Sequence, residues 1–239
     1  FWKIRTKSTI MATGALERPL VFPNNDRPGV MLATAVSGYL HRYGVLAGKR
    51  IVIFTNNSIG HRTASVISNT TAKVVSIIDS RPESFGPWEQ ANLTKGIEVR
   101  WQSRVFNTRG RKQIKGALVG SIDSKRREWL DCDLLAMSGG LSPTINLYAH
   151  TGGKVVWKDS QRAYFPDSSE SNFTAVGLCN QDETLYDALV HGYSVGQLAA
   201  SNLGYRPDRS WSPTVIGDDL LAVFDSVSPS IQDSETKKA

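Results

Sequence analysis

The chain has 239 residues, of which 40% are hydrophobic and 21% charged, with a formal net charge of +6. This length allows one large domain or two smaller ones with buried cores, and the composition is that of a globular protein. No run of ~18 apolar residues occurs, so a transmembrane helix is not expected, and the opening stretch FWKIRTKST lacks the apolar region of a signal peptide.

The positive charge is dispersed along the chain. The two densest basic clusters, residues 109–112 and 125–127, each lie beside an expected strand and are typical of hairpin turns with solvated charges. Positive charge alone gives only non-specific attraction to nucleic acid. Zinc-finger spacing and RNA-binding aromatic motifs are absent from the sequence. A nucleic-acid partner is therefore not expected.

The cysteines and histidines indicate neither a redox pair nor a metal centre. Cys132 and Cys179 are too far apart for a C-x-x-C motif, and isolated cysteines in such a chain are usually buried and reduced. This indicates a cytoplasmic protein. The histidines stand outside metal-ligand spacing: His41, His61, His150 and His191. We therefore expect no bound metal. No residue of the chain is predicted to be catalytic. We expect His41 and His61 to be surface or packing residues on helices.

The first segment, residues 1–47, begins with an expected strand over 8–11 that ends in Ala-Thr-Gly. Residues 19–30 contain three prolines and are predicted to form an extended connector. Apolar spacing over residues 30–43 predicts an amphipathic helix. Glu17 and Arg18, just before the connector, are expected to pair with each other at the surface.

Residues 51–79 have the order of a dinucleotide-binding unit: strand, tight turn, helix, strand, acid. In such a unit the turn has the sequence G-x-G-x-x-G, and the acid ~20 residues later holds the ribose. Here the glycine positions fall on Thr55, Asn57 and Gly60. The side chains of this turn, including that of Asn56, would fill the space that the pyrophosphate of a bound dinucleotide would occupy. We interpret the turn and Asp79 as a degenerate phosphate site, while Asp79 could either hold a ribose or cap a loop.

The remaining elements follow in order. Helical periodicity is expected near residues 88–95 and 184–202, and strand patterns over 97–107, 114–122, 127–130, 132–138, 153–157 and 172–176. The glycine pair at 139–140 marks a crossing between domains. Residues after Arg206 are rich in Ser, Pro and Asp and are expected to form a surface linker.

Two expected strands end at a glycine, where the lack of a side chain lets the backbone approach a bound nucleotide. The first ends at Thr13 and Gly14, and the second at Gly177 and Leu178. The helix that follows the second strand begins near Glu183, and its first N–H groups would point toward phosphate or ribose. The predicted cofactor-binding residues are Thr13, Gly14, Gly177, Leu178, Glu183 and Leu185.

This order of features is that of a flavoprotein with two dinucleotide-binding domains, one interrupting the other. Three stretches resemble the α subunit of heterotetrameric sarcosine oxidase: WKIRTKSTIMATGALERPLVFPNNDRPGVMLATA, YGVLAGKRIVIFTNN and MSGGLSPTINLYAHTGGKVVW. The TNN turn favours this branch over related α subunits of cyanide-forming glycine oxidases and amino-acid dehydrogenases. The resemblance covers residues 2–206.

The resemblance implies an α/β fold of the glutathione reductase-like, FAD/NAD(P)-binding Rossmann type, with an incomplete first domain. We expect residues 1–47 and 141–206 to form the C-terminal parts of the first, NAD-holding domain. Residues 48–140 would form the inserted second domain, a scaffold that has lost its nucleotide, and residues 207–239 a linker. The chain is expected to be an internal fragment, because the first glycine loop and the C-terminal region of the family are absent.

The family oxidises sarcosine (N-methylglycine), passing electrons to oxygen and the methyl carbon to tetrahydrofolate. The resemblance implies NAD in the α subunit, FMN between α and β, FAD in β, and tetrahydrofolate in the missing C-terminal region. The implied partners are the β, γ and δ subunits together with the amine substrate, with no membrane involved. The flavin performs the redox chemistry in such enzymes. This chain alone is therefore expected to be inactive.

Other interpretations remain open. The chain could be a non-catalytic assembly module whose dinucleotide fold binds nothing, or belong to a related amino-acid oxidase or dehydrogenase of glycine, proline or opine type. A pyridine-nucleotide disulfide reductase is disfavoured, because C-x-x-C and C-x-x-x-x-C pairs are absent from the sequence. A nucleic-acid binder comes last.

Overall fold

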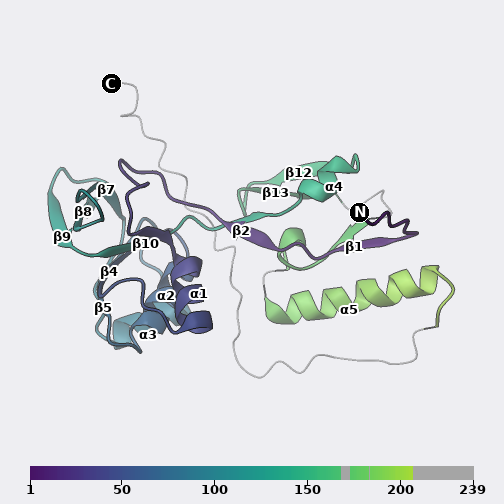
Figure 1. Cartoon of the computed structure of the whole chain (residues 1–239), viewed down its shortest axis with the longest axis horizontal. Helices are drawn as coiled ribbons and strands as arrows, with labels where there is room; N and C mark the ends of the chain where they lie inside the picture. The colour runs from purple at the N-terminus through teal and green to yellow at the C-terminus, as the bar shows by residue number, and fades with distance from the viewer. Residues whose placement is uncertain (168–172, 183, 207–239) are drawn as a thin grey trace. The chain divides into compact units, whose positions relative to one another are not determined.

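The computed structural model describes residues 1–167, 173–182 and 184–206, and it forms two compact units (Figure 1). Unit 1 combines residues 1–16 with the described residues from Leu141 onward, and unit 2 comprises Glu17–Gly140. The chain therefore leaves unit 1, forms unit 2 and returns. Strands β2 (Ala15–Glu17) and β11 (Leu141–Pro143) pair with each other at the two places where the chain passes between units.

Unit 2 is built on a five-stranded sheet in the order β3-β10-β4-β5-β6. The strands are β3 (Val30–Leu32), β4 (Arg50–Thr55), β5 (Lys73–Asp79), β6 (Val99–Arg100) and β10 (Leu134–Ser138). Every neighbouring pair is parallel. A parallel sheet is covered on both faces, which explains why RIVIFT and LLAMS are nearly continuous apolar runs.

Layers on either side of this sheet complete unit 2 (Figure 1). Helices α1 (Ala33–Tyr43) and α2 (Ser58–Ile67) cover one face, and α3 (Pro87–Thr94) packs beside α2. The other face carries an antiparallel sheet of β7 (Ser103–Arg109), β8 (Gly116–Ser121) and β9 (Arg127–Asp131). Side chains along β4 alternate between the two faces of the sheet and so pack against both layers. Ile51 and Ile53 pack in the cluster of the helices, whereas Val52 and Phe54 pack in that of the antiparallel sheet.

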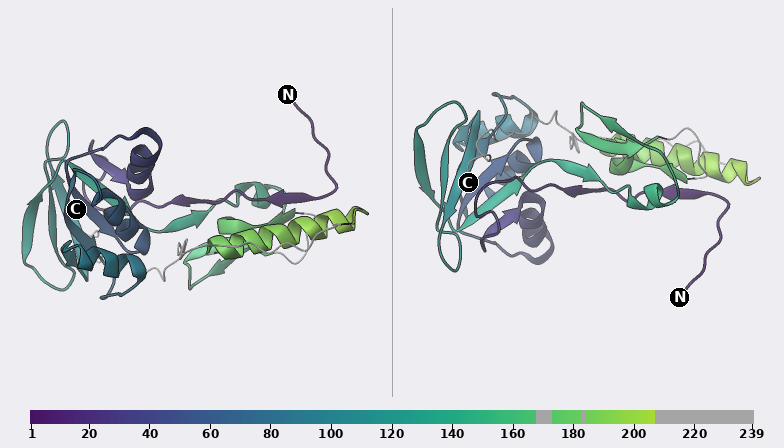
Figure 2. Two further views of the ribbon diagram at one scale, coloured as in Figure 1. Left: turned by 90° about the horizontal axis from the view of Figure 1, so that it is seen from below. Right: turned by 90° about the horizontal axis from the view of Figure 1, so that it is seen from above.

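Unit 1 has smaller sheets. Strand β1 (Thr9–Met11) pairs in parallel with β14 (Phe173–Ala175), and β12 (Val155–Lys158) pairs antiparallel with β13 (Ala163–Pro166). Its helices are α4 (Asn146–His150), a 3₁₀ turn over Gly177–Asn180 and α5 (Leu185–Asn202). Helix α5 is the long yellow-green helix in both views of Figure 2. Its core includes the fully buried side chains of Tyr148, Phe165 and Cys179.

The structure differs from the sequence expectations at several points. The unit that was expected to begin at residue 48 begins at Glu17, because β3 pairs with β10 and α1 packs against α2. Residues 30–32 are therefore a strand rather than the first turn of a helix. The expected strand over 97–107 is divided at Gln102, whose φ is 47°. The predicted linker, residues 207–239, lies outside the described residues.

Helices α1, α2, α3 and α5 form where helices were predicted. Helix α4 and strand β13 were not predicted. Within the described part of the chain, no helix is long and apolar enough to cross a membrane.

Candidate functional site

The polar side chains of the turn between β4 and α2 form hydrogen bonds with other groups of the chain. Asn57 caps α2, since its side chain accepts a hydrogen bond from the Ile59 N–H at 2.9 Å. Its amide also donates to the Ser138 carbonyl and hydroxyl oxygens, both at 3.1 Å. The Thr55 hydroxyl donates to the Asn57 carbonyl at 2.8 Å. Thr55, Asn56 and Asn57 are all buried, so their polar atoms fill the place where a phosphate loop would be open.

Gly60, at the third glycine position, lies in the first turns of α2 against β4. A Cβ atom at this position would be 2.5 Å from the Thr55 Cβ. Real Cβ atoms do not approach one another so closely, so glycine is what allows α2 to pack directly on the strand. This is the helix–strand packing role that the last glycine has in a dinucleotide-binding turn.

Asp79 ends β5 at the same edge of the sheet and is fully buried. Its Oδ2 lies 2.9 Å from His61 Nε2 and accepts a hydrogen bond of 2.9 Å from the Arg81 guanidinium. The Arg81 backbone N–H donates to Oδ1 at 2.8 Å. Both carboxylate oxygens of Asp79 are thus bonded within the protein, in the position where a ribose-binding acid would face a ligand.

A second buried carboxylate joins Asp79. Glu89, from the first turn of α3, accepts hydrogen bonds from Arg81 at 2.9 Å and from the Ser58 hydroxyl at 2.7 Å. The Asn92 amide donates to the His61 carbonyl at 2.9 Å. We call this set the Asp79 network: Ser58, His61, Asp79, Arg81, Glu89 and Asn92, all buried.

Sequence reasoning identified Asp79 but missed its partners. Arg81 and Glu89 are loop and helix residues with no motif between them, and His61 was expected only to be a surface or packing residue on a helix. The structure places His61 at 0% exposure, with the Trp101 ring stacked on it at 5.4 Å. Asp79, Arg81 and Glu89 come together because of the way the loop between β5 and α3 folds. The local sequence pattern does not predict the course of this loop.

In unit 1, the predicted cofactor-binding residues lie mostly at one sheet edge. Because Met11 is the parallel partner of Ala175, the segments after β1 and β14 begin side by side. Gly14 and Gly177 both have left-handed φ angles, 68° and 75°. A Cβ atom on either glycine would meet nothing within 4 Å. This edge therefore presents two backbone turns with open space beside them. Leu178 follows Gly177 in the 3₁₀ turn.

The start of α5 borders this turn. Leu185 is the first helical residue, and Thr184 caps the helix by accepting from the Asp187 N–H at 3.0 Å. Glu183 lies outside the described residues. Asp182 accepts a hydrogen bond from the Gly177 N–H at 2.5 Å and is 2.8 Å from His191 Nδ1, which fixes the turn. A hollow of about 500 Å³ opens here. It is lined by Gln181, Asp182, Thr184, Asp187, Val190, His191 and Ser194.

Glu17 caps a helix from a distance in the sequence. Helix α1 has no side-chain cap of its own at Leu32. Glu17 Oε2 instead accepts hydrogen bonds from the Thr34 N–H at 2.9 Å and the Thr34 hydroxyl at 2.6 Å. A carboxylate at a helix N-terminus is favourable. Burial nevertheless raises the pKa of Glu17 above its ordinary value of 4.5, and these hydrogen bonds oppose that shift.

A Glu17→Gln substitution should change how stability depends on pH. Because the pKa of Glu17 is raised on folding, the folded chain binds its proton more tightly than the unfolded chain does. This contribution is present at low pH and is lost as the pH rises through the folded pKa. Relative to Glu17→Gln, the natural chain should therefore become less stable as the pH rises above the ordinary glutamate pKa of 4.5. Urea unfolding at several pH values measures this, and parallel pH profiles would contradict it.

Comparison of the sequence with known proteins identifies relatives, although no family model matches it. The chain is 34% identical over 211 residues to the sarcosine oxidase alpha subunit of Corynebacterium sp. (strain P-1), covering 86% of this chain and 22% of that protein. It is 36% identical over 209 residues to the sarcosine oxidase alpha subunit of Rhizobium meliloti (strain 1021), covering 85% and 20%. A component of opine oxidase from Rhizobium meliloti (strain 1021), its A subunit, is 25% identical over 183 residues, covering 68% and 40%.

Solved structures share the fold. Thioredoxin reductase of T. acidophilum superposes with a TM-score of 0.65 at 18% identity, covering 82% of this chain and 66% of that one. L-proline dehydrogenase of P. horikoshii gives 0.60 at 18% identity, covering 84% and 36%. The predicted flavoprotein-type fold and the resemblance to sarcosine oxidase α subunits are thus confirmed. The chain spans about a fifth of the length of those subunits.

Proposed function

We propose that this chain, a homologue of sarcosine oxidase α subunits, supplies the dinucleotide-domain region of such a protein. The observation that carries the proposal is the identity of 34% over 86% of the chain. The enzyme would oxidise sarcosine at its C–N bond in the cytoplasm and pass the methyl carbon to tetrahydrofolate. In it, FMN would lie at the interface between α and β, FAD would belong to β, and γ and δ subunits would complete the assembly.

Within this chain, unit 1 would hold NAD. The turns at Gly14 and Gly177 have room beside them for a cofactor, since a Cβ on either would have no neighbour within 4 Å. The first turn of α5, which begins at Leu185, would supply N–H groups toward phosphate or ribose. Glu183, the other residue predicted here, lies outside the described residues. NAD bound here would serve as a nucleotide cofactor, while the residues of this chain would bind and orient it.

Unit 2 would act as a scaffold without a nucleotide. Its turn is closed by Asn57 and Ser138, and Asp79 is bonded to His61 and Arg81. A pyrophosphate would have to displace buried, hydrogen-bonded side chains, and each group left unpaired would cost about 1–3 kcal/mol. This supports one dinucleotide per chain, bound by unit 1, and no activity of this chain by itself.

The exposed face of α5 supports assembly with further protein. Val195 is its one buried residue among those described, whereas Tyr186, Leu189, Val190 and Leu198 are exposed. Exposed apolar side chains on one element are typical of a surface that packs against more polypeptide. This favours the multi-subunit enzyme over an isolated module.

The experiment is to purify the native protein, measure the mass of the polypeptide, and extract its nucleotides after denaturation. We expect a longer chain that carries NAD, with flavin in a co-purifying partner. The Gly177→Asn variant should lose most of its NAD, because the new side chain would enter the open space. Gly152→Asn is the matched control: Gly152 also has a left-handed φ, 83°, with nothing within 4 Å. Asparagine tolerates this conformation best among residues with a side chain.

If the purified protein carries no nucleotide, the NAD assignment is overturned. The alternative of a non-catalytic assembly module would then be favoured. Equal loss of NAD in Gly177→Asn and Gly152→Asn would show that strain rather than the site is responsible. Opine oxidation is a second candidate, supported by the opine oxidase relative at 25% identity. This second candidate would be favoured if the intact complex oxidises an opine but does not oxidise sarcosine.

A further inference from the structure

The antiparallel sheet of unit 2 has one buried and one solvent-facing side. Val105, Ala117 and Val119 point inward and are almost fully buried in the core. Because side chains alternate along strands, the intervening residues form the opposite surface. We call this surface the outer face: Arg104, Phe106, Arg109, Leu118, Arg127, Trp129 and Asp131. Cross-strand pairing places Leu118 directly beside Trp129.

Arginine side chains lie on the aromatic rings of the outer face. The guanidinium carbons of Arg127 and Arg104 lie 3.8 Å and 4.4 Å from the centre of the Phe106 ring. That of Arg109 lies 5.0 Å from the Trp129 ring, which is 41% exposed. Such contacts hold long side chains in defined positions. The outer face is therefore an ordered surface. Residues 111–112 and 125–126 of the two basic clusters are exposed in the turns between these strands, as the sequence predicted.

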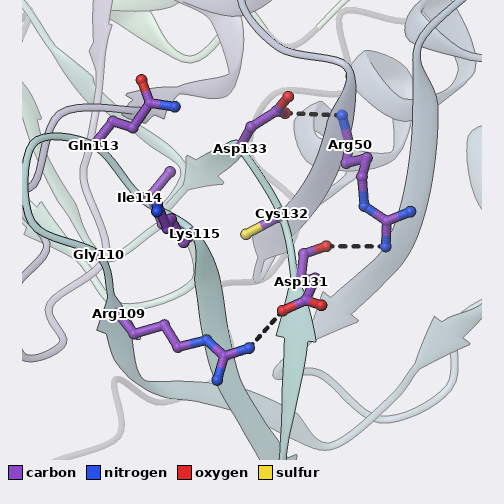
Figure 3. Close-up of a pocket in the computed structure, with 9 residues that line it drawn as sticks. All are labelled: Arg50, Arg109, Gly110, Gln113, Ile114, Lys115, Asp131, Cys132 and Asp133. Carbon is purple, nitrogen blue, oxygen red and sulfur yellow. Dashed lines mark hydrogen bonds and ion pairs between the residues drawn. The ribbon is translucent and has the colours of Figure 1, made fainter.

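A hollow of about 480 Å³ adjoins the outer face at Arg109 and Asp131 (Figure 3). Arg50 and Lys115 add two further cations to its lining. Asp131 pairs with Arg109 at 2.5 Å, and the Asp133 carboxylate accepts the Arg50 backbone N–H at 2.8 Å. Cys132 is buried in this wall, and burial first, with the two flanking aspartates, raises its pKa to about 12. The raised pKa keeps its thiol in the protonated form at neutral pH, which is the poorer nucleophile.

The charges of this region are unbalanced. Besides Arg104, the outer face and the hollow carry four cationic side chains against two carboxylates: Arg50, Arg109, Lys115 and Arg127 against Asp131 and Asp133. Among the described residues, no carboxylate lies within ion-pair distance of Arg50, Lys115 or Arg127. Guanidinium groups bind carboxylates through paired hydrogen bonds, so these positions are available to acidic groups of another molecule.

We propose that the outer face and its hollow bind an acidic protein segment that also carries apolar side chains. Tryptophan and arginine are the residue types that contribute most to protein interfaces. Leu118 and Trp129 would receive the apolar groups, and the arginines and Lys115 the carboxylates. A nucleic acid fits less well, because base stacking needs open ring faces. The Phe106 and Trp129 rings already carry guanidinium groups.

The test uses the full chain and a fluorescein-labelled synthetic peptide of alternating glutamate and leucine. Fluorescence anisotropy should show binding at low salt that weakens as ionic strength rises. The double variant Arg109→Glu/Arg127→Glu should weaken binding at least about tenfold through charge repulsion. The control is Arg62→Glu, since Arg62 also lies over a tryptophan ring, that of Trp88 at 5.9 Å, but on α2. Arg62→Glu should bind as the natural chain does.

A second double variant, Arg109→Gln/Arg127→Gln, removes the charges without reversing them and should give a smaller loss. Circular dichroism establishes that each variant is folded. No peptide binding at low salt would overturn the proposal. So would an equal loss in Arg62→Glu, which would indicate attraction by net charge alone. If an oligothymidylate binds more tightly than the peptide, the proposal of a protein partner is overturned in favour of a nucleic acid.

Discussion

Replacement of Arg81 by methionine should lower the free energy of unfolding of unit 2 by about 3–5 kcal/mol. The Arg81 guanidinium lies 2.9 Å from both Asp79 and Glu89, whose side chains are fully buried. Methionine has a similar length but donates no hydrogen bond. Two buried carboxylates would then lack the guanidinium that they share, which is far more costly than the loss of an exposed ion pair.

Urea unfolding followed by circular dichroism and tryptophan fluorescence measures this effect. Fluorescence is informative, because Trp101 stacks on His61 next to Arg81's partner Asp79. The matched control is Arg62→Met, on the exposed surface of α2, which should change stability by no more than about 0.5 kcal/mol. A loss below about 1 kcal/mol for Arg81→Met would show that the network contributes little net stability. The two units are monitored separately, since a chain of two units need not unfold in one step.

Gly60→Ala should destabilise unit 2 by about 1–3 kcal/mol or more. The added methyl group would lie 2.5–2.8 Å from three side-chain atoms of Thr55. Thr55 cannot move aside easily, because it is fully buried and its hydroxyl is bonded to Asn57. Helix α2 would have to shift away from β4, which would disturb the packing of Ala64 and Ile67 against the sheet.

Gly38→Ala is the control for Gly60→Ala. Gly38 also lies inside a helix, α1, but an added Cβ there would meet nothing within 4 Å. Alanine is the better helix former, so Gly38→Ala should stabilise the protein by about 0.5–1 kcal/mol. Thermal unfolding of the two variants should therefore shift in opposite directions. Equal shifts would contradict the close helix–strand contact at Gly60.

Much of the fold was predictable because its signals are local. Apolar runs located β4, β5 and β10, with a glycine pair after β10, and helical periodicity located α1 and α5. The boundary of unit 2 was not predictable in this way. Strand β3 is only three residues long, and it is a strand because it pairs with β10, where Val30 is opposite Leu135. A partner so distant along the chain leaves no trace in local periodicity.

The sequence by itself determined the order of the longer helices and strands, the replacement of glycines in the β4–α2 turn, and the resemblance that the comparisons confirm. These depend on residue type and spacing, which are local properties. Only the tertiary structure decided what the polar residues of the turn and Asp79 bind: Ser138, His61 and Arg81. It likewise decided which arginines lie together on the outer face. Hydrogen-bond and ion-pair partners are chosen by proximity in space, and folding brings them together from separate strands, helices and loops.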